Sequence, residues 1–159
     1  RIYMIIITAT ESHIPEIVEI WKEFMDFHSD IDPYFARNEE GHLKFEDWVK
    51  DLMKSESALV LVALEDGQVM AYSLSQINKR PPLFKEVDYG YVYDLAVKSE
   101  YRRKGIGEQM LGEILRWFKS HQIDRIELMV LAKNQAAFSF WEKHGFKVFL
   151  NRMYLPKEK

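Results

Sequence analysis

The chain has 159 residues and a formal net charge of −3, and 47% of its residues are hydrophobic while 30% are charged. This composition is typical of a globular protein and excludes a disordered or fibrous chain, and the length fits a single domain over residues 1–159. The sequence contains no cysteine, which excludes disulfides, a thiol nucleophile and cysteine-ligated metals. A cysteine-free sequence fits a cytoplasmic protein.

The net charge and the spacing of the histidines limit which kinds of molecule or ion this protein is expected to bind. A negative net charge disfavours non-specific binding to nucleic acid, which usually needs a basic field, and therefore favours a small-molecule partner. The five histidines do not share the helical spacing that aims two ligands at one metal, so we expect no metal. The apolar start of the chain is too short to cross a bilayer, so we expect no membrane partner and a first strand there.

Apolar spacing and turn residues predict the order of the elements. Short runs rich in β-branched residues predict strands, and apolar residues recurring every three to four positions predict helices. The predicted strands are residues 2–8, 58–64, 69–77, about 89–97, 125–131 and 146–155. The predicted helices are residues 10–28, 43–53, 106–121 and 134–145, with a loop over 28–41. Strands that alternate with helices in the second half predict a mixed sheet in an α/β fold with right-handed crossovers.

The stretch "EYRRKGIGEQML", residues 100–111, places two glycines at the expected start of a helix. A helix N-terminus offers unpaired backbone N–H groups and a positive dipole end, which together favour a phosphate. The dinucleotide pattern G-x-G-x-x-G fails because Met110 stands where the third glycine is required. The nucleotide P-loop pattern fails at the same position. This strand-to-helix corner with Gly105 and Gly107, the glycine corner, therefore predicts a phosphate site of another kind. The simpler alternative is a tight turn that binds no ligand.

Two segments resemble the GCN5-related N-acetyltransferases, which use acetyl-coenzyme A. Arg102-x-x-Gly105-x-Gly107 after a strand is similar to the pyrophosphate loop of that superfamily. Further along, "NQAAFSFWEKHGF" matches its second segment, which begins at Asn134. The order of the predicted elements is also similar over essentially the whole chain. The resemblance implies a single-domain fold with a mixed sheet of six to seven strands and about four helices.

The resemblance also implies an activity and a set of cofactor residues. It implies transfer of acetyl from acetyl-coenzyme A, without a metal, to a primary amine of a small molecule or protein by direct attack in a ternary complex. Backbone N–H groups from Arg103 to Gly107 would hold the pyrophosphate, and the strand before them would hold the pantetheine arm and polarise the thioester carbonyl. The implied cofactor-binding residues are Leu95, Ala96, Val97, Arg102, Arg103, Lys104, Gly105, Ile106, Gly107, Asn134, Phe140 and Trp141. The simpler role for Asn134 is that of a helix N-cap, and one residue can both cap a helix and bind the cofactor.

The catalytic base is expected to be Asp94, on the strand just before the implied cofactor residues. Strand alternation predicts that Asp94 and Val92 share one face and that Tyr91 and Tyr93 share the other. A structural carboxylate is the alternative for Asp94, and the two tyrosines are rival groups that would more simply shape a pocket.

The leaving-group acid is where the sequence departs from the family. Many members have a tyrosine at the position of Trp141, whose indole N–H cannot act as an acid. Tyr154 is a candidate for the acid in place of that tyrosine. The simpler interpretation is that Tyr154 is only an aromatic residue of an edge strand.

The acceptor is not named by the sequence. An acidic first loop would suit a cationic amine, but such loops are often only solvated. A coenzyme A-binding regulatory module with little catalysis is the main alternative, and a nucleic-acid binder is a third. The last predicted strand offers an edge through which a homodimer could form.

Overall fold

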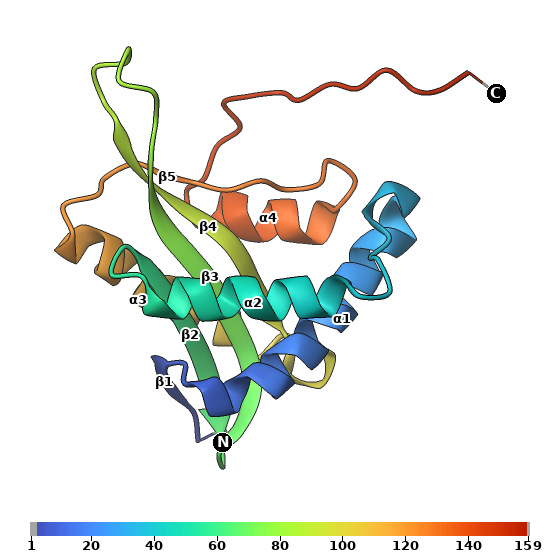
Figure 1. Cartoon of the computed structure of the whole chain (residues 1–159), viewed down its shortest axis with the longest axis vertical. Helices are drawn as coiled ribbons and strands as arrows, with labels where there is room; N and C mark the ends of the chain where they lie inside the picture. Colours follow the sequence, from blue (N-terminus) through green and yellow to red (C-terminus); the bar gives the residue numbers. More distant parts are fainter. Residues whose placement is uncertain (1–2, 159) are drawn as a thin grey trace. The chain divides into compact units, whose positions relative to one another are not determined.

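The computed structural model describes residues 3–158. These residues form two compact units, one up to Leu128 and one from Met129 onward. The first unit carries the strands β1 (Ile5–Thr8), β2 (Ala58–Glu65), β3 (Gln68–Lys79), β4 (Asp88–Val97) and β5 (Ile126–Glu127), and the helices α1 (Ile14–Ile31), α2 (Gly41–Lys54) and α3 (Ile106–Ser120). The second unit carries helix α4 (Gln135–Lys143) (Figure 1). A single domain over residues 1–159 stays a prediction.

The five strands of the first unit form one mixed sheet in the order β1-β2-β3-β4-β5. The first four strands pair antiparallel, and β2 and β3 are joined by a tight turn at Asp66 and Gly67. The last pair is parallel and short, with Gly90 opposite Ile126 and Tyr91 opposite Glu127. A parallel pair needs a crossover, and α3 supplies it between β4 and β5. The mixed sheet predicted from the order of elements is therefore present.

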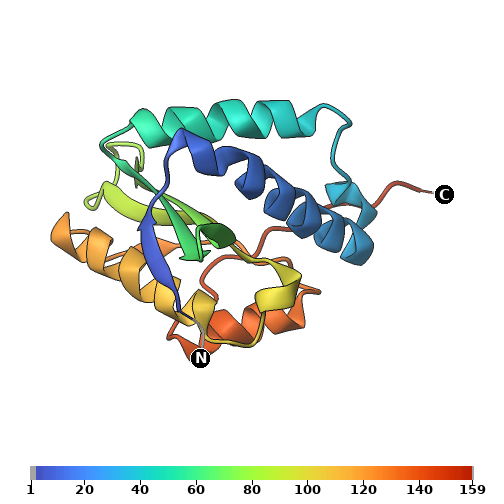
Figure 2. The same ribbon diagram turned by 90° about the horizontal axis from the view of Figure 1, so that it is seen from below.

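Helices cover both faces of the sheet. Helices α1 and α2 lie on one face, and α3 lies on the opposite face (Figure 2). On the first face the rings of Trp21 and Phe45 stack with centroids 4.6 Å apart. On the second face Phe118 of α3 packs against the backbone of Gly90, where an added Cβ would lie 2.6 Å from the ring. Helices α1, α2 and α3 each bury apolar residues at the three-to-four-residue spacing that predicted them.

Two of the predicted strands are wrong. Only Ile126–Glu127 of the expected strand 125–131 pairs with a neighbour, and residues 146–155 contain no strand. The expected six to seven strands are therefore five in the part of the chain that the structure describes. The reason is that β-forming side chains such as Val148 and Leu150, which are 62% and 72% exposed, supply propensity but not a paired backbone.

The start and end of α1 also differ from expectation. A 3-10 turn, Glu11–His13, follows Thr10, and the α-helix itself begins at Ile14. At the other end α1 runs through residues 29–31, which were expected to be loop, and stops at Asp32. Pro33 follows directly, and a residue before proline avoids helical backbone angles, so the stop is set locally.

Candidate active site

A β-bulge interrupts β4 at the position where the catalytic base was expected. Leu74 and Ser75 are consecutive on β3, yet they pair with Asp94 and Val92, so Tyr93 is the extra residue. Beyond the bulge the alternation of side chains along β4 is reversed. The predicted separation of Asp94 from Tyr93 onto opposite faces is therefore wrong.

Contacts with neighbouring elements show that Tyr93 and Asp94 lie on the same face. The ring of Tyr93 packs against Trp48 of α2, with centroids 5.0 Å apart. Asp94 accepts a 2.9 Å hydrogen bond from the hydroxyl of Tyr72, whose ring lies 6.1 Å from Phe45 of α2. Both side chains thus point toward the layer of helices α1 and α2.

The bulge also reverses which backbone groups face the free edge of β4. Gly90 N–H donates to the carbonyl of Arg125 on the β5 side at 2.7 Å, whereas Lys98 N–H donates to Met70 on β3 at 2.8 Å. Since alternate residues of a strand point to the same edge, the backbone groups of Leu95 and Val97 point away from β3. Without the extra residue, the backbone groups of Leu95 and Val97 would form hydrogen bonds with β3.

The edge to which Leu95 and Val97 point is open within the first unit. Strand β5 ends at Glu127 and pairs with β4 only at Gly90 and Tyr91, so within residues 3–128 no strand lies along this edge beyond Tyr91. Ala96, between the two residues, is buried with its side chain in the core of the first unit. The segment thus offers the backbone N–H and carbonyl of Leu95 and the N–H of Val97 on a rigid strand, while the carbonyl of Val97 accepts from Arg102 Nε.

The glycine corner follows this strand and leads into α3. Arg103 and Gly105 have positive φ angles of 62° and 78°, and α3 begins at Ile106, which is buried. A Cβ at Gly105 would meet nothing within 4 Å, so its backbone angle, not crowding within the protein, favours glycine there. Within residues 3–158, the N–H groups from Arg103 to Gly107 have no hydrogen-bond acceptor. Free N–H groups at a helix start form an anion site.

The three cationic side chains of the corner differ in their surroundings. Arg102 turns back onto the strand, where its Nε donates to the carbonyl of Val97 at 3.2 Å, and one of its terminal nitrogens lies 3.5 Å from Glu23 of α1. The ammonium of Lys104 lies 5.6 Å from the ring of Tyr101. Neither Arg103 nor Lys104 forms an ion pair with any residue of 3–158. The charge available to a phosphate therefore comes from Arg103 and Lys104, while that of Arg102 is partly neutralised.

A small hollow adjoins the start of α3. It has a volume of about 260 Å³ and is lined by Met4, Lys104, Ile106 and Gln109. Two of the predicted cofactor residues, Lys104 and Ile106, thus border a concave surface in the first unit.

Asp94 has the electrostatic properties of a general base. Burial raises the pKa of its carboxyl from the ordinary 3.8 to about 6, and the hydrogen bond from Tyr72 and the nearby His28 partly oppose this rise. The imidazole Nδ1 of His28 lies 2.7 Å from the carbonyl of Phe24, which can only accept, so this nitrogen carries the proton. A carboxylate with a pKa near 6 is ionised at pH 7 and still basic enough to take a proton through water.

Tyr93, the bulged residue, is held in a polar network. Its hydroxyl donates to Gln76 Oε1 at 3.0 Å and accepts from Asn78 Nδ2 at 3.2 Å. Its ring lies 4.8 Å from that of Tyr91, and burial raises the pKa of Tyr91 above its ordinary value. A raised pKa keeps Tyr91 protonated at neutral pH, and the hydroxyl of Tyr93 is already bonded to two side chains, which suits both residues to shape a pocket better than to act as bases.

The remaining predicted site residues belong to the second unit. Asn134 caps α4, since its side-chain oxygen accepts from the N–H of Ala137 at 3.1 Å. The rings of Phe140 and Trp141 lie 5.0 Å apart, and Trp141 also contacts Phe146 at 5.2 Å. Tyr154 is 82% exposed and lies in no strand.

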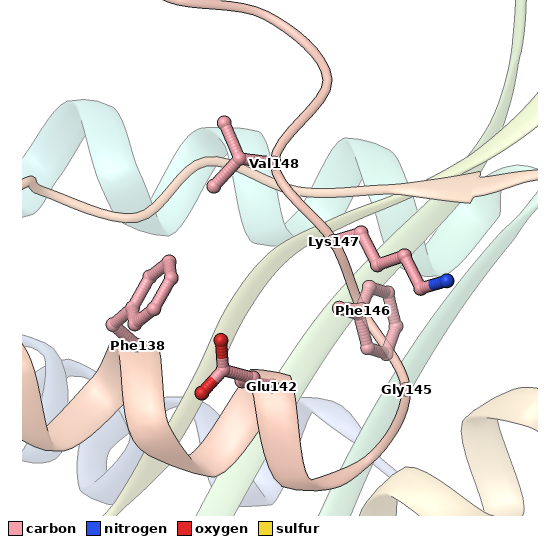
Figure 3. A pocket seen from close by; sticks show the side chains of 6 residues that line it. All are labelled: Phe138, Glu142, Gly145, Phe146, Lys147 and Val148. Atoms are coloured by element: carbon pink, nitrogen blue, oxygen red, sulfur yellow. The ribbon is translucent and has the colours of Figure 1, made fainter.

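A second hollow lies within this unit, between α4 and the segment that follows it. It has a volume of about 370 Å³ and is lined by Phe138, Glu142, Gly145, Phe146, Lys147 and Val148 (Figure 3). The positive φ of 92° at Gly145 turns the chain away from the helix, as the predicted stop requires. None of the predicted site residues lines this hollow, so we assign no role in the reaction to it.

The described residues offer neither a metal site nor a membrane-spanning helix. Within residues 3–158 no group of three His, Asp or Glu side chains is placed to hold a metal ion. Over the same residues, no helix has the length and apolar character needed to cross a membrane.

The two motifs and the bulged strand point to one family, and sequence comparison decides it. Residues 16–146 match the profile of the acetyltransferase (GNAT) family. The chain belongs to this family. The L-amino acid N-acetyltransferase AaaT of Escherichia coli (strain K12) is 24% identical over 132 residues, which cover 80% of this chain and 77% of that protein. The resemblance seen in the motifs is confirmed, and the protein is an N-acetyltransferase.

Solved structures share the fold of this chain. A mutant of the BH1408 protein from Bacillus halodurans superposes with a TM-score of 0.89 at 27% identity, covering 97% of this chain and 99% of that one. A predicted acetyltransferase from Clostridium acetobutylicum, solved with acetyl-CoA, has a TM-score of 0.78 at 20% identity and covers 97% and 96% of the two chains. At that identity the second likeness shows the fold alone. The fold is thus an α/β acetyltransferase fold with a five-stranded sheet.

Sequence reasoning did not identify Tyr72, the hydrogen-bond partner of Asp94. Tyr72 stands in a strand whose neighbours, such as Ala71 and Leu74, are buried and apolar, so nothing in its local pattern marks it. Only the pairing of β3 with β4 brings its hydroxyl to the carboxylate. The signal that could have found it is a tyrosine among small and apolar residues in the middle of a predicted strand, because a buried hydroxyl needs a partner.

Proposed function

We propose that this acetyltransferase transfers the acetyl group of acetyl-coenzyme A to a primary amine by direct attack in a ternary complex. The observation that carries the proposal is the bulge at Tyr93. The bulge turns the backbone of Leu95 and Val97 to an open edge, and it places the side chain of Asp94 on the face of α1 and α2. One strand thereby presents a thioester-binding edge and a base.

The cofactor would lie along β4 and end at the glycine corner. Backbone groups of Leu95 and Val97 would bond the pantetheine arm, and the free N–H groups from Arg103 to Gly107 would hold the pyrophosphate. The side chains of Arg103 and Lys104 would add charge. Asn134, Phe140 and Trp141 are assigned to the cofactor by the family motif alone.

Deprotonation of the acceptor is the larger chemical task. A lysine-like amine with a pKa of about 10.4 is neutral in only roughly one molecule in a few thousand at pH 7. Asp94 would take one proton of the ammonium through a water, and the neutral amine nitrogen would then attack the thioester carbon, which moves negative charge onto the carbonyl oxygen. As the C–N bond forms and the C–S bond breaks, the nitrogen loses its second proton to water, and coenzyme A leaves as a thiolate that takes up a proton. A backbone N–H on the free edge would stabilise the oxyanion.

A proton for the leaving thiolate helps the reaction less than a base for the amine does. A thiol with a pKa of about 8.5 is already a tolerable leaving group, so a positioned acid is helpful but not required. Trp141 would pack against the pantetheine, and Tyr154 stays the proposed donor, although its side chain is exposed and outside any strand.

The acceptor class is an amine of a small molecule or of a protein. The relative AaaT is named for L-amino acids, which supports a small acceptor with a free amino group. The acidic first loop supports this less than expected. Asp26, which lies in α1 just before this loop, pairs with Arg37 at 2.9 Å, and Asp32 accepts from the N–H of Tyr34, so both carboxylates already have partners.

An acceptor screen tests the proposal. Purified protein is mixed with acetyl-coenzyme A and panels of amino acids, polyamines, aminoglycosides and peptides, and free thiol is followed with time. We expect thiol release that depends on one class of amine. Binding of coenzyme A without thiol release over every acceptor would favour the regulatory module instead. Gly107→Glu places a carboxylate where phosphate is expected and should abolish coenzyme A binding, and salt-sensitive nucleic-acid binding that survives this change would support the third alternative.

A further inference from the structure

Glu23 of helix α1 contacts the turn that leads into the cofactor loop. Its carboxylate accepts the backbone N–H of Ser99 at 2.8 Å and the hydroxyl of the same residue at 3.3 Å. It also lies 3.5 Å from a terminal nitrogen of Arg102. These contacts connect residues 76 and 79 positions apart, and both views place the turn after β4 beside α1 (Figures 1 and 2).

The contact with Ser99 is of a kind that fixes backbone. Ser99 opens the 3-10 turn Ser99–Tyr101, whose first N–H group has no acceptor within the turn itself. A carboxylate that bonds such a group acts as a cap, and a charge-assisted bond to backbone is stronger than an exposed ion pair. Glu23 therefore holds the start of the segment that ends at the glycine corner.

The contact with Arg102 fixes the other end of this turn. Arg102 is the first residue of the Arg-x-x-Gly-x-Gly motif, and its Nε is already bonded to the carbonyl of Val97. Its guanidinium also lies 5.8 Å from the ring of Phe27, one turn further along α1. The guanidinium is thus held between β4 and α1, and Glu23 supplies its counter-charge.

We propose that Glu23 is a positioning residue for the cofactor loop and sets the affinity for coenzyme A from helix α1. Glu23 does not touch the cofactor in this proposal. It holds Ser99 and Arg102 so that the free N–H groups from Arg103 to Gly107 are arranged before the pyrophosphate binds. The inference rests on the proposed function, since it requires the corner to bind coenzyme A.

Glu19 provides a matched control on the same helix. It lies one turn before Glu23, its side chain is 71% exposed, and its ion pair is with Lys22 of α1 itself, at 3.3 Å. Glu19→Ala thus removes the same charge and the same number of atoms from α1 without touching the loop.

The experiment compares Glu23→Ala, Glu23→Gln and Glu19→Ala with the wild type. Coenzyme A binding is measured by calorimetry, and KM and kcat are measured with a saturating acceptor. For Glu23→Ala we expect the dissociation constant and the KM for acetyl-coenzyme A to rise about tenfold, with kcat within about twofold. Glu23→Gln should lie between, because its amide oxygen can still accept from Ser99 but carries no charge for Arg102. Glu19→Ala should match the wild type.

Several results would overturn the inference. One is a Glu23→Ala variant that binds coenzyme A as tightly as Glu19→Ala. A loss of melting temperature with unchanged affinity would make the role of Glu23 merely structural, and a loss confined to kcat would also contradict positioning of the cofactor. A wild-type protein that binds no coenzyme A would overturn the proposed function, whereas failure of the inference alone appears only in the variants.

A double-mutant cycle separates the two contacts of Glu23. If Glu23 acts partly through Arg102, the loss of affinity in Glu23→Ala with Arg102→Ala is smaller than the sum of the two single losses. Strict additivity would overturn the Arg102 part of the inference.

Discussion

The glycine corner and the face around Asp94 lie on the same stretch of chain but work by different physics. At the corner, backbone N–H groups are left free by chain geometry, and φ at Gly105 is 78°. At Asp94 a side chain is partly buried, and its pKa is raised by that burial. In the proposed function the first region would bind charge with backbone, and the second would hold a proton with side chains. Damage to the corner should therefore weaken cofactor binding, whereas damage around Asp94 should change rate and pH dependence.

Asp94→Asn tests the second region and should have the largest effect. We expect kcat to fall by about 10² to 10⁴, because a positioned base contributes rate enhancements of that size. The KM for acetyl-coenzyme A should change little. Steady-state kinetics at pH 7.5 with coenzyme A titrations check both, and an unchanged kcat would remove Asp94 from the reaction.

The same substitution should stabilise the fold. The folded pKa of Asp94, about 6, lies above the ordinary 3.8, so the stability contributed by its protonated form is fully present below pH 3.8 and is lost as pH rises through about 6. Above that pH the buried charge is a cost, which asparagine removes. We expect Asp94→Asn to raise the free energy of unfolding at pH 8 by on the order of 2 kcal/mol. Denaturant unfolding of the variant and the wild type at pH 8 and pH 4 measures this difference in the free energy of unfolding. The difference should vanish at pH 4.

Gly105→Ala tests the corner, and Gly67→Ala is its control. Both glycines have φ of 78° and nothing within 4 Å of an added Cβ, so alanine costs about 1 kcal/mol of strain at each. Gly67 lies in the turn between β2 and β3, outside the Arg102–Gly107 motif. We expect equal losses of melting temperature, but a rise of about tenfold in the dissociation constant of coenzyme A only for Gly105→Ala. Equal cofactor affinity in the two variants would contradict the assignment of the corner.

Tyr72→Phe refines the account of Asp94. The hydrogen bond from Tyr72 lowers the pKa of Asp94, so its removal should raise that pKa further above its present value of about 6. The acid limb of kcat/KM should move to higher pH by up to about one unit. A pH–rate profile measures the shift, and a limb that stays in place would show that Asp94 does not control it.

Trp141→Tyr should have the smallest effect and in the opposite direction. It restores the hydroxyl that many family members carry at this position, which could protonate the leaving thiolate. We expect kcat to rise by no more than about tenfold, because a thiolate already leaves without much help. Tyr154→Phe should lower kcat if Tyr154 supplies the proton, and no change in kcat would exclude it.

Local features of the sequence were predicted well. The four helices, the strands predicted at residues 58–64 and 69–77 and the glycines before α3 depend on residues close together in the chain, such as Gly105 before Ile106, and the structure contains all of them. The strands expected at residues 125–131 and 146–155 failed for a different reason. Their side chains favour extended backbone, but a strand exists only where another strand supplies hydrogen bonds, and no local pattern specifies that partner.

The sequence by itself determined the family, through the spacing of Arg102, Gly105 and Gly107 and the segment that starts at Asn134. The tertiary structure decided how β4 presents its groups. A bulge is a mismatch between two paired strands, so neither strand encodes it alone, and it reverses the face of Asp94 and the edge of Leu95. The tertiary structure also decided two contacts, that of Tyr72 with Asp94 and that of Glu23 with Ser99. Each contact joins residues that are far apart in the chain and meet only when the sheet and helices pack.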